Sequence, residues 1–235
     1  MKESTSVNSF LYNFSNSNGI YLPMQSLKAL IGRGESQFLE FKFEVNSARD
    51  ISETLSAFAN ADGGTILVGV KDNGVIAGIR LEEELYVLEA AADMYCKPAL
   101  KPILKRWDID GKSVLEVIIA EHFPKPIVSE SQPGNWRAWI RIGASNRLAS
   151  PVHLRLWQMG KNQEPPPSTF SEKEKTILDL FNQKKRMSLN QVSKFSRLPR
   201  YQVIRCLADF TRWELIGCEP EASGGYIFTL REDFN

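Results

Sequence analysis

Two glutamates and a lysine are the first residues whose types and spacing could do chemistry. Glu35 and Glu40 stand five positions apart, and Lys42 follows Glu40 by two. Side chains alternate between the two faces of a strand, so Glu40 and Lys42 point the same way in an extended segment. A turn before that strand could bring Glu35 beside Glu40, and carboxylate oxygens are the ligands that divalent cations take. The simpler alternative is a glutamate–lysine pair on a solvated face, since exposed charge is the norm.

A third carboxylate, Asp72, follows the apolar run 65–70. Near Glu40 it would complete a set of three oxygen ligands. Its simpler role is turn chemistry, because Asp-Asn-Gly between two apolar runs is a strong hairpin signal. The glycines around it do not predict ATP binding. A phosphate-binding P-loop needs Gly-Lys followed by Ser or Thr, whereas Gly69 precedes Val70.

A second cluster, near the C-terminus, could bind phosphate groups. Residues 180–208 hold seven basic side chains and no aspartate or glutamate. These are Lys184, Lys185, Arg186, Lys194, Arg197, Arg200 and Arg205. Such a one-signed stretch is the electrostatic footprint of a nucleic-acid contact surface. Arg200, Gln202 and Arg205 fall in the first half of a predicted helix, where side chains reach base edges in the major groove. Duplex DNA is the favoured partner and RNA the alternative; the simpler interpretation is a solvated face used for protein contacts.

The elements that must position these residues follow from local patterns. The sequence predicts strands over 37–43, 65–70, 75–79, 103–109, 114–120 and 136–142, and helices over 47–61, 82–95 and 151–158. Ser47 is the expected N-cap of the first helix. Strands and helices are mixed and include hairpins, so the expected class is α+β with a mixed sheet rather than a doubly wound parallel sheet.

Residues 170–235 predict a smaller unit. Helices are expected over 172–181, after the capping box that Ser188 and Gln191 form, and from Pro199 onwards; two short strands follow over 214–219 and 226–230. Three helices followed by a hairpin resemble a winged helix-turn-helix domain. Acidic residues flank the hairpin, where they would repel phosphate: Glu214, Glu219 and Glu221.

A run of three prolines at 165–167 marks the boundary between the two parts, because it favours an extended spacer. We therefore expect an N-terminal tail over 1–21, an α+β domain over 22–160, a linker over 161–169 and the winged helix over 170–235. With 29 basic and 28 acidic residues, the net charge of +1 does not by itself indicate a nucleic-acid partner.

Composition also limits the compartment. The three cysteines are widely separated and form no C-x-x-C pair, which disfavours disulfides and a cysteine zinc site and favours a reducing, cytoplasmic location. No apolar run approaches the ~20 residues of a membrane span, and the first nineteen residues are too polar for a secretory leader. His122 and His153 stand alone in the sequence and are assigned no role.

Three ordered segments carry a family resemblance. They are Glu35-Ser36-x-x-x-Glu40-Phe41-Lys42, then Ala57-Phe58-Ala59-Asn60-Ala61-x-Gly63-Gly64-Thr65-Ile66-Leu67-Val68-Gly69-Val70-x-Asp72-x-Gly74, and finally Trp139-Ile140-Arg141-Ile142-Gly143-Ala144-Ser145-Asn146. From about residue 26 to 157 the chain resembles the Schlafen-type Alba-like (AlbA) domain, formerly labelled a divergent AAA ATPase. The resemblance implies a DNA-binding or regulatory role, and Arg141 joins the expected nucleic-acid-binding residues.

The same resemblance implies a rival activity. Schlafen relatives include RNA endonucleases that use two glutamates and an aspartate, which correspond here to Glu35, Glu40 and, as the best candidate, Asp72. In that case the three carboxylates hold Mg²⁺ or Mn²⁺, and Lys42 stabilises charge that develops on the phosphate. Those enzymes clamp RNA between duplicated lobes, so a single-lobed chain is expected to form a homodimer. The leading expectation is a dimeric DNA-binding regulator without enzymatic activity, and the third alternative is a non-catalytic protein-interaction module.

Overall fold

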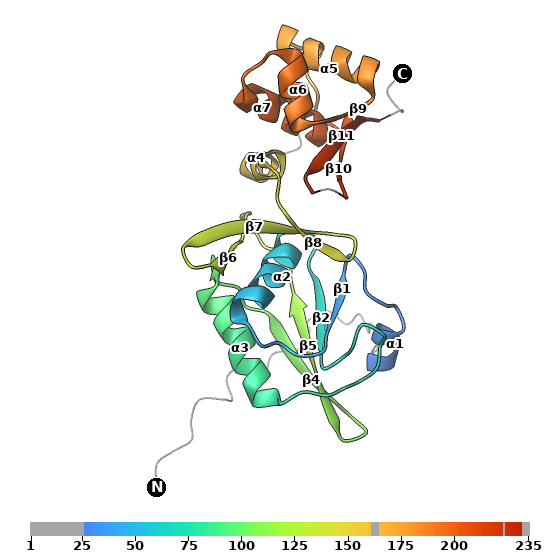
Figure 1. Cartoon of the computed structure of the whole chain (residues 1–235), viewed down its shortest axis with the longest axis vertical. Coiled ribbons are helices and arrows are strands. Elements are labelled where there is room, and N and C mark those ends of the chain that lie inside the picture. Colours follow the sequence, from blue (N-terminus) through green and yellow to red (C-terminus); the bar gives the residue numbers. More distant parts are fainter. Residues whose placement is uncertain (1–25, 161–164, 223, 232–235) are drawn as a thin grey trace. The chain divides into compact units, whose positions relative to one another are not determined.

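The computed structural model describes residues 26–160, 165–222 and 224–231 (Figure 1). The chain divides into two compact units. The N-terminal unit comprises residues 26–123 and 127–148, and the C-terminal unit comprises residues 124–126 and the described residues from 149 onwards. The expected tail over 1–21 and the first part of the expected linker lie outside the described residues.

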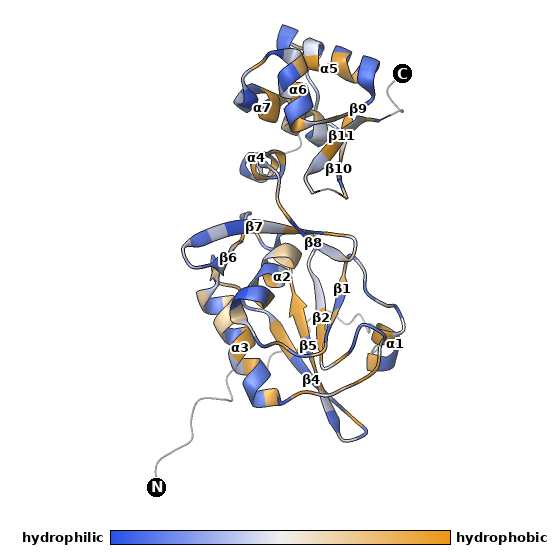
Figure 2. Ribbon diagram, viewed as in Figure 1, coloured by the Kyte–Doolittle hydropathy of each residue, from blue (hydrophilic) through white to orange (hydrophobic). Residues whose placement is uncertain are grey.

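A four-stranded mixed sheet forms the centre of the N-terminal unit. Its strands are β1 (Leu39–Lys42), β2 (Gly64–Val68), β5 (Lys112–Ile119) and β4 (Ile103–Ile109), in that spatial order. β1 and β2 are parallel, whereas β2–β5 and β5–β4 are antiparallel. The prediction of an α+β fold with a mixed sheet is thus confirmed. Figure 2 shows β2 and β5 as hydrophobic segments, as expected for central strands that are buried.

Two helices cover one face of this sheet. They are α2 (Ala48–Asn60) and α3 (Leu81–Met94). Leu55 and Phe58 of α2 and Leu88 of α3 are fully buried against the sheet. The Ser47 hydroxyl accepts a hydrogen bond from the Asp50 N–H, as an N-cap should. The opposite face of the sheet carries a smaller apolar cluster, which the short helix α1 (Leu27–Ile31) partly covers.

A second antiparallel sheet lies across α2. Its order is β3 (Cys96–Lys97), β6 (Val128–Gln132), β7 (Asn135–Ile142) and β8 (Ser145–Leu148). Asn60, at the end of α2, donates its side-chain amide to the carbonyls of Ile127 and Trp139, both at 2.7 Å, and accepts the Ile127 N–H at 2.7 Å. One buried amide therefore satisfies three backbone groups that would otherwise lose water without compensation. Only β7 of this sheet was predicted from the sequence.

The predicted strand over 75–79 does not form. The turn after β2 is present, because the Gly74 N–H donates to the Lys71 carbonyl at 2.7 Å, but only a single bridge between Val70 and Ile76 continues it. Gly69 and Gly78 have φ values of 95° and 85°, outside the range of extended backbone. The two strands of the expected hairpin are therefore interrupted at both glycines.

The C-terminal unit contains four helices and a three-stranded antiparallel sheet among its described residues. In chain order they are α4 (Pro151–Met159), α5 (Glu172–Lys184), β9 (Arg186–Ser188), α6 (Leu189–Ser196), α7 (Arg200–Arg212), β10 (Ile216–Pro220) and β11 (Tyr226–Leu230). The sheet order is β10-β11-β9. The capping box predicted at Ser188 and Gln191 is present, and Ser171 with Glu174 forms another.

Helix α4 belongs to this unit, although the proline run in the sequence predicted that it would be part of the N-terminal domain. Val152 of α4 is fully buried in the core that also contains Phe181, Leu207 and Phe210. The shared burial of apolar side chains, which stabilises the folded unit, therefore places the boundary before α4 and not at the prolines. The proline run lies between two helices that share one core.

Candidate nucleic-acid interface and the Arg141 network

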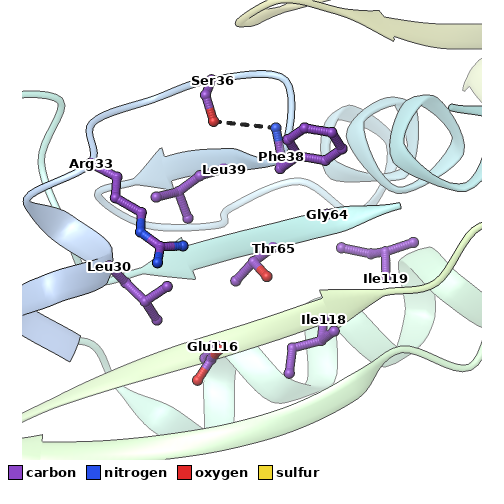
Figure 3. Close-up of a pocket in the computed structure, with 10 residues that line it drawn as sticks. All are labelled: Leu30, Arg33, Ser36, Phe38, Leu39, Gly64, Thr65, Glu116, Ile118 and Ile119. Atoms are coloured by element: carbon purple, nitrogen blue, oxygen red, sulfur yellow. Dashed lines mark hydrogen bonds between the residues drawn. The ribbon is translucent and has the colours of Figure 1, made fainter. Parts of the chain in front are cut away.

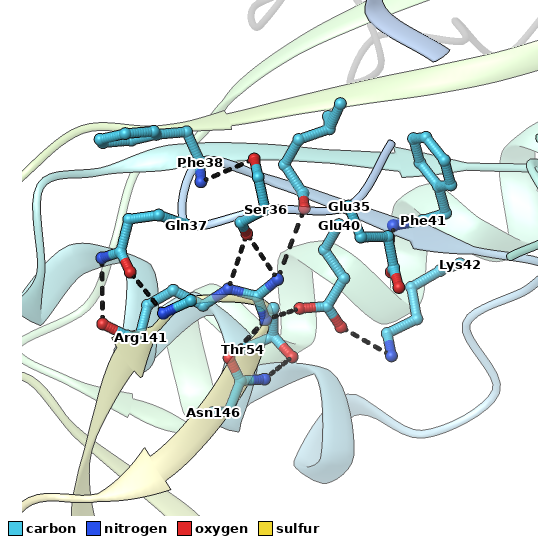
Figure 4. A network of polar contacts seen from close by, with 12 residues as sticks. Glu35, Ser36, Gln37, Phe38, Glu40, Phe41, Lys42, Thr54, Arg141 and Asn146 are labelled. Carbon is cyan, nitrogen blue, oxygen red and sulfur yellow. Dashed lines mark hydrogen bonds and ion pairs between the residues drawn. The ribbon is translucent and has the colours of Figure 1, made fainter. Parts of the chain in front are cut away.

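Arg141 joins the two sheets of the N-terminal unit. Strand β7 carries it to β1, where one guanidinium nitrogen, Nη1, donates to the Glu40 carboxylate and, at 2.9 Å, to Asn146 Oδ1 (Figure 4). Nη2 and Nε donate to the Ser36 carbonyl at 3.0 and 3.3 Å. The guanidinium carbon also lies 4.8 Å from the centre of the Phe58 ring. All three guanidinium nitrogens thus have partners inside the protein.

The burial of Arg141 corrects one expectation. Its residue exposure is 3%, so its side chain is not available to a phosphate or a base at the surface. A buried charge is tolerated only when it is paired and hydrogen-bonded, which the Glu40 carboxylate and the backbone carbonyls provide. Arg141 therefore acts as a brace between β7 and β1, and the expectation that it contacts nucleic acid is wrong for this structure.

The three carboxylates of the expected metal site take separate roles. Glu40 is 5% exposed, and its second oxygen lies 2.7 Å from Lys42 Nζ. Glu35 accepts the Phe41 N–H at 2.9 Å, and Asp72 is exposed in the turn after β2. Within residues 26–160, 165–222 and 224–231, no three His, Cys, Asp or Glu side chains gather as a metal site requires. The role of Glu35, Glu40 and Asp72 as metal ligands of a ribonuclease therefore stays a prediction.

Sequence reasoning missed the partners that complete this network. The Asn146 side-chain amide donates to Thr54 Oγ1 at 2.8 Å, which links β8 to α2. Gln37 donates to the Arg141 carbonyl at 3.0 Å and accepts the Gly143 N–H at 2.7 Å. Asn146 stood in the third matching segment, but nothing local indicated that its partner would be Thr54. The pairs are roughly a hundred positions apart, and only the fold joins them.

The basic residues of the C-terminal unit lie at its surface. All seven side chains of the stretch 180–208 are exposed; they are Lys184, Lys185, Arg186, Lys194, Arg197, Arg200 and Arg205. We call this set the basic face. It begins at the end of α5, includes one residue of β9, and continues over α6 and the first half of α7. No carboxylate lies within that stretch of sequence to neutralise it.

Helix α7 packs its apolar side into the core of the C-terminal unit and leaves its opposite side exposed to solvent. Val203 and Leu207 are completely buried, whereas Tyr201 is 70% exposed and Arg205 lies one turn further along. Residues four apart share a face of a helix, so Tyr201 and Arg205 form a continuous exposed side. Arg200 Nη1 donates to Asn190 Oδ1 of α6, which holds this guanidinium at the start of the helix.

Gln202 is less available than the sequence suggested. Its side chain is half-buried, its amide nitrogen donates to Tyr201 Oη at 2.9 Å, and its amide oxygen is buried without a hydrogen-bond partner. Asp209 follows Arg205 by one helical turn. Burial raises the pKa of the Asp209 carboxyl, an effect that the positive charge of Arg205 opposes. Among the seven residues of the basic face, Arg205 is therefore the one closest in sequence to a carboxylate.

None of the helices in the described ranges is long and apolar enough to cross a membrane. No curated protein matches the chain. Among solved structures, the chain is similar to the DIP2311 protein of Corynebacterium diphtheriae, at 17% identity and a TM-score of 0.46 over 83% of this chain and 38% of that one. It spans well under half of that protein.

Two further solved structures match smaller parts of the chain. One concerns the regulation of DNA binding of Bordetella bronchiseptica BpsR by 6-hydroxynicotinic acid, at 15% identity and a TM-score of 0.27 over 35% of this chain and 63% of that one. The other is the N-terminal domain of a protein related to the ATP-dependent DNA helicase RecG from Nitrosomonas europaea, at 23% identity and a TM-score of 0.36 over 54% of this chain and 95% of that one.

A family comparison covers the N-terminal unit almost entirely. Residues 35–150 match the family described as Schlafen, AlbA_2. The matched range begins at Glu35 and includes every residue of the Arg141 network described above. It ends before the helices that carry the basic face. Over residues 35–150, this chain is therefore similar to the Schlafen AlbA_2 family.

Proposed function

We propose that the C-terminal unit is a winged helix that binds duplex DNA, and that the protein is a DNA-binding regulator. One observation carries the proposal: seven basic side chains and no acidic one occupy residues 180–208, and all seven are exposed. A surface of one sign releases counterions from the phosphate backbone when it binds, which is the main source of affinity for DNA.

The order of elements supports the same proposal. Helices α5, α6 and α7 precede the β10–β11 hairpin, and β9 adds a third strand. This order resembles that of a winged helix-turn-helix domain, which supports the proposal. Helix α7 takes the place of the recognition helix, whose N-terminal residues contact base edges in the major groove. Arg200, Tyr201 and Arg205 are the exposed side chains of its first half.

The N-terminal unit has a supporting role in this proposal. It provides the dimerisation surface or a second binding surface that the Schlafen AlbA resemblance implies. The Arg141 network stabilises that unit rather than contacting the ligand. The homodimer stays a prediction, which light scattering of the full chain in solution checks directly.

The test is a titration of labelled duplex DNA with the full chain, followed by fluorescence anisotropy at increasing salt. If the basic face makes about four phosphate contacts, affinity falls at least about 100-fold between about 50 and 200 mM salt. Arg205→Gln should weaken binding and lower the slope of log K against log salt by about one. Affinity that stays flat across this salt range would overturn the proposal.

A matched control separates local contact from net charge. Lys173→Gln removes one positive charge from an exposed position on α5, outside the stretch 180–208. It changes the net charge by the same amount as Arg205→Gln, so its slope should equal that of the wild type. Equal losses in the two variants would mean that total charge, not the basic face, attracts DNA.

A further inference from the structure

A pocket of about 420 Å³ opens on the sheet face that α2 and α3 leave uncovered (Figure 3). Strand register explains its floor. Leu39 of β1 pairs with Thr65 of β2, and Thr65 pairs with Ile118 of β5, so these three side chains form one row across the sheet. The volume falls within the roughly 300–1,000 Å³ of small-molecule sites.

The segment before β1 forms the other wall. Leu30 comes from α1 and Arg33 from the turn that follows, and both lie over the row on the sheet (Figure 3). Phe38 lies in the turn directly before β1 and is 56% exposed. The pocket thus has two apolar side chains, Leu39 and Ile118, on either side of Thr65 in its floor, and a guanidinium at one side.

Some polar groups of the pocket already have hydrogen-bond or ion-pair partners within the protein, and others do not. The Glu116 carboxylate is 7% exposed, accepts the Trp107 Nε1–H at 2.7 Å and lies 3.6 Å from Lys105 Nζ. The Ser36 hydroxyl accepts the Phe38 N–H at 3.3 Å. By contrast, the Arg33 guanidinium and the Thr65 hydroxyl have no hydrogen-bond or ion-pair partner among the described residues.

We propose that this pocket binds a small carboxylic acid with an apolar body. Among the described residues that line the pocket, the one uncompensated charge is that of Arg33, because Lys105 and Trp107 already satisfy Glu116. Arg33 pairs with the carboxylate through charge-assisted hydrogen bonds, which are stronger than neutral ones. The apolar body lies on Leu39 and Ile118, and the Thr65 hydroxyl donates to the same carboxylate or to a substituent on the body. This site is separate from the basic face and does not depend on the proposed DNA binding.

The test uses two matched probes on the full chain, 4-fluorobenzoate and its neutral analogue 4-fluorobenzamide. Their ¹⁹F NMR signals are followed during titration with protein, and dissociation constants are compared. The proposal expects benzoate to bind at least about tenfold more tightly than the amide, since one charge-assisted contact is worth about that factor. Absence of benzoate binding in the millimolar range, or equal affinity for both probes, would overturn it.

Three variants locate the binding. Arg33→Gln should abolish the preference for benzoate while the weak affinity for the amide persists, and Ile118→Trp should block both probes by filling the floor. Lys28→Gln removes an exposed charge from α1 without lining the pocket and should bind as the wild type does. If Ile118→Trp does not fold, as circular dichroism would show, Arg33→Gln against Lys28→Gln still decides: equal benzoate affinity in those two variants contradicts the proposal.

Discussion

At the scale of single residues, Arg141 shows how burial changes the meaning of a side chain. An arginine in a segment that resembles a nucleic-acid-binding family looks like a ligand contact in the sequence. In the structure its exposure is 3%, and the Glu40 carboxylate and the Ser36 carbonyl occupy its donors. The charge that a surface arginine would offer to phosphate is used here to hold β7 against β1.

This role leads to a prediction about stability. Arg141→Gln leaves the buried Glu40 carboxylate with Lys42 as its remaining ion-pair partner, and breaking a buried ion pair costs about 3–5 kcal/mol. Urea denaturation followed by circular dichroism measures the loss. Arg137→Gln, an exposed position on the same strand, should cost no more than about 0.5 kcal/mol. If the Arg141→Gln variant kept full stability but bound DNA more weakly, Arg141 would have to contact DNA directly, and the bracing role would be wrong.

At the scale of elements, helix α4 depends on a partly buried histidine. His153 Nδ1 accepts the Ser150 N–H at 3.2 Å, which completes the capping box, and the ring lies edge-on to Tyr226 at 4.7 Å. Burial lowers the pKa of His153 to about 4. Protonation would also remove the acceptor that the cap requires. The histidine that had no assigned role in the sequence thus ties the start of α4 to β11.

The pH dependence of stability follows from that pKa. The folded-state pKa lies below the value of about 6.5 in the unfolded chain, so the unfolded state binds more protons between pH 6.5 and 4. The stability that neutral His153 contributes is fully present above about pH 6.5 and is lost as the pH falls from about 6.5 to about 4. At about pH 5 the loss is roughly 2 kcal/mol. Urea denaturation of the wild type at pH 7 and pH 5 measures it.

His153→Gln serves as the comparison for this pH effect. Glutamine can accept the same N–H at the cap but does not titrate, so the difference between pH 7 and pH 5 should shrink by about the same 2 kcal/mol. An unchanged pH difference in the variant would assign the effect to other groups. Other titrating residues, such as the carboxyls with raised pKa at Glu84 and Asp209, remain the same in both proteins.

At the scale of the whole molecule, the chain has separate cores. One core joins α2, α3 and the four-stranded sheet, and another joins α4, α5, α6, α7 and the three-stranded sheet. Because α4 contributes Val152, Leu156 and Met159 to the second core, the folding unit begins near residue 149 and not after the prolines. The boundary is set by shared burial rather than by the spacer.

Two fragments test this boundary. The fragment 149–235 should fold cooperatively by itself, whereas the fragment 165–235 lacks α4 and exposes the apolar surface beneath Val152. Without the burial of Val152 alone, the free energy of unfolding should fall by about 1.5–3 kcal/mol. Thermal unfolding followed by circular dichroism gives the transition temperatures of the two fragments, and the fragment without α4 should unfold at the lower temperature. Equal transition temperatures would mean that α4 adds no stability to this unit.

Local patterns in the sequence determined much of this protein. Ser47 before α2, the Ser188–Gln191 capping box and the Asp110–Gly111 turn between β4 and β5 act within a few residues, so their side chains and backbone specify the structure without help from distant parts. The exposed charge of the basic face was equally visible, because a run without carboxylates keeps its sign wherever the chain folds.

Only the tertiary structure decided the roles that depend on distant partners. Arg141 and Glu40 are 101 positions apart, and no local pattern states that the two charges neutralise each other rather than serve a ligand. The same holds for Asn60, which closes three backbone hydrogen bonds across α2 and the second sheet, and for the row Leu39–Thr65–Ile118 that floors the pocket. The physical reason is that burial and charge compensation are properties of packed neighbours, which strand register and helix packing bring together only in the folded chain.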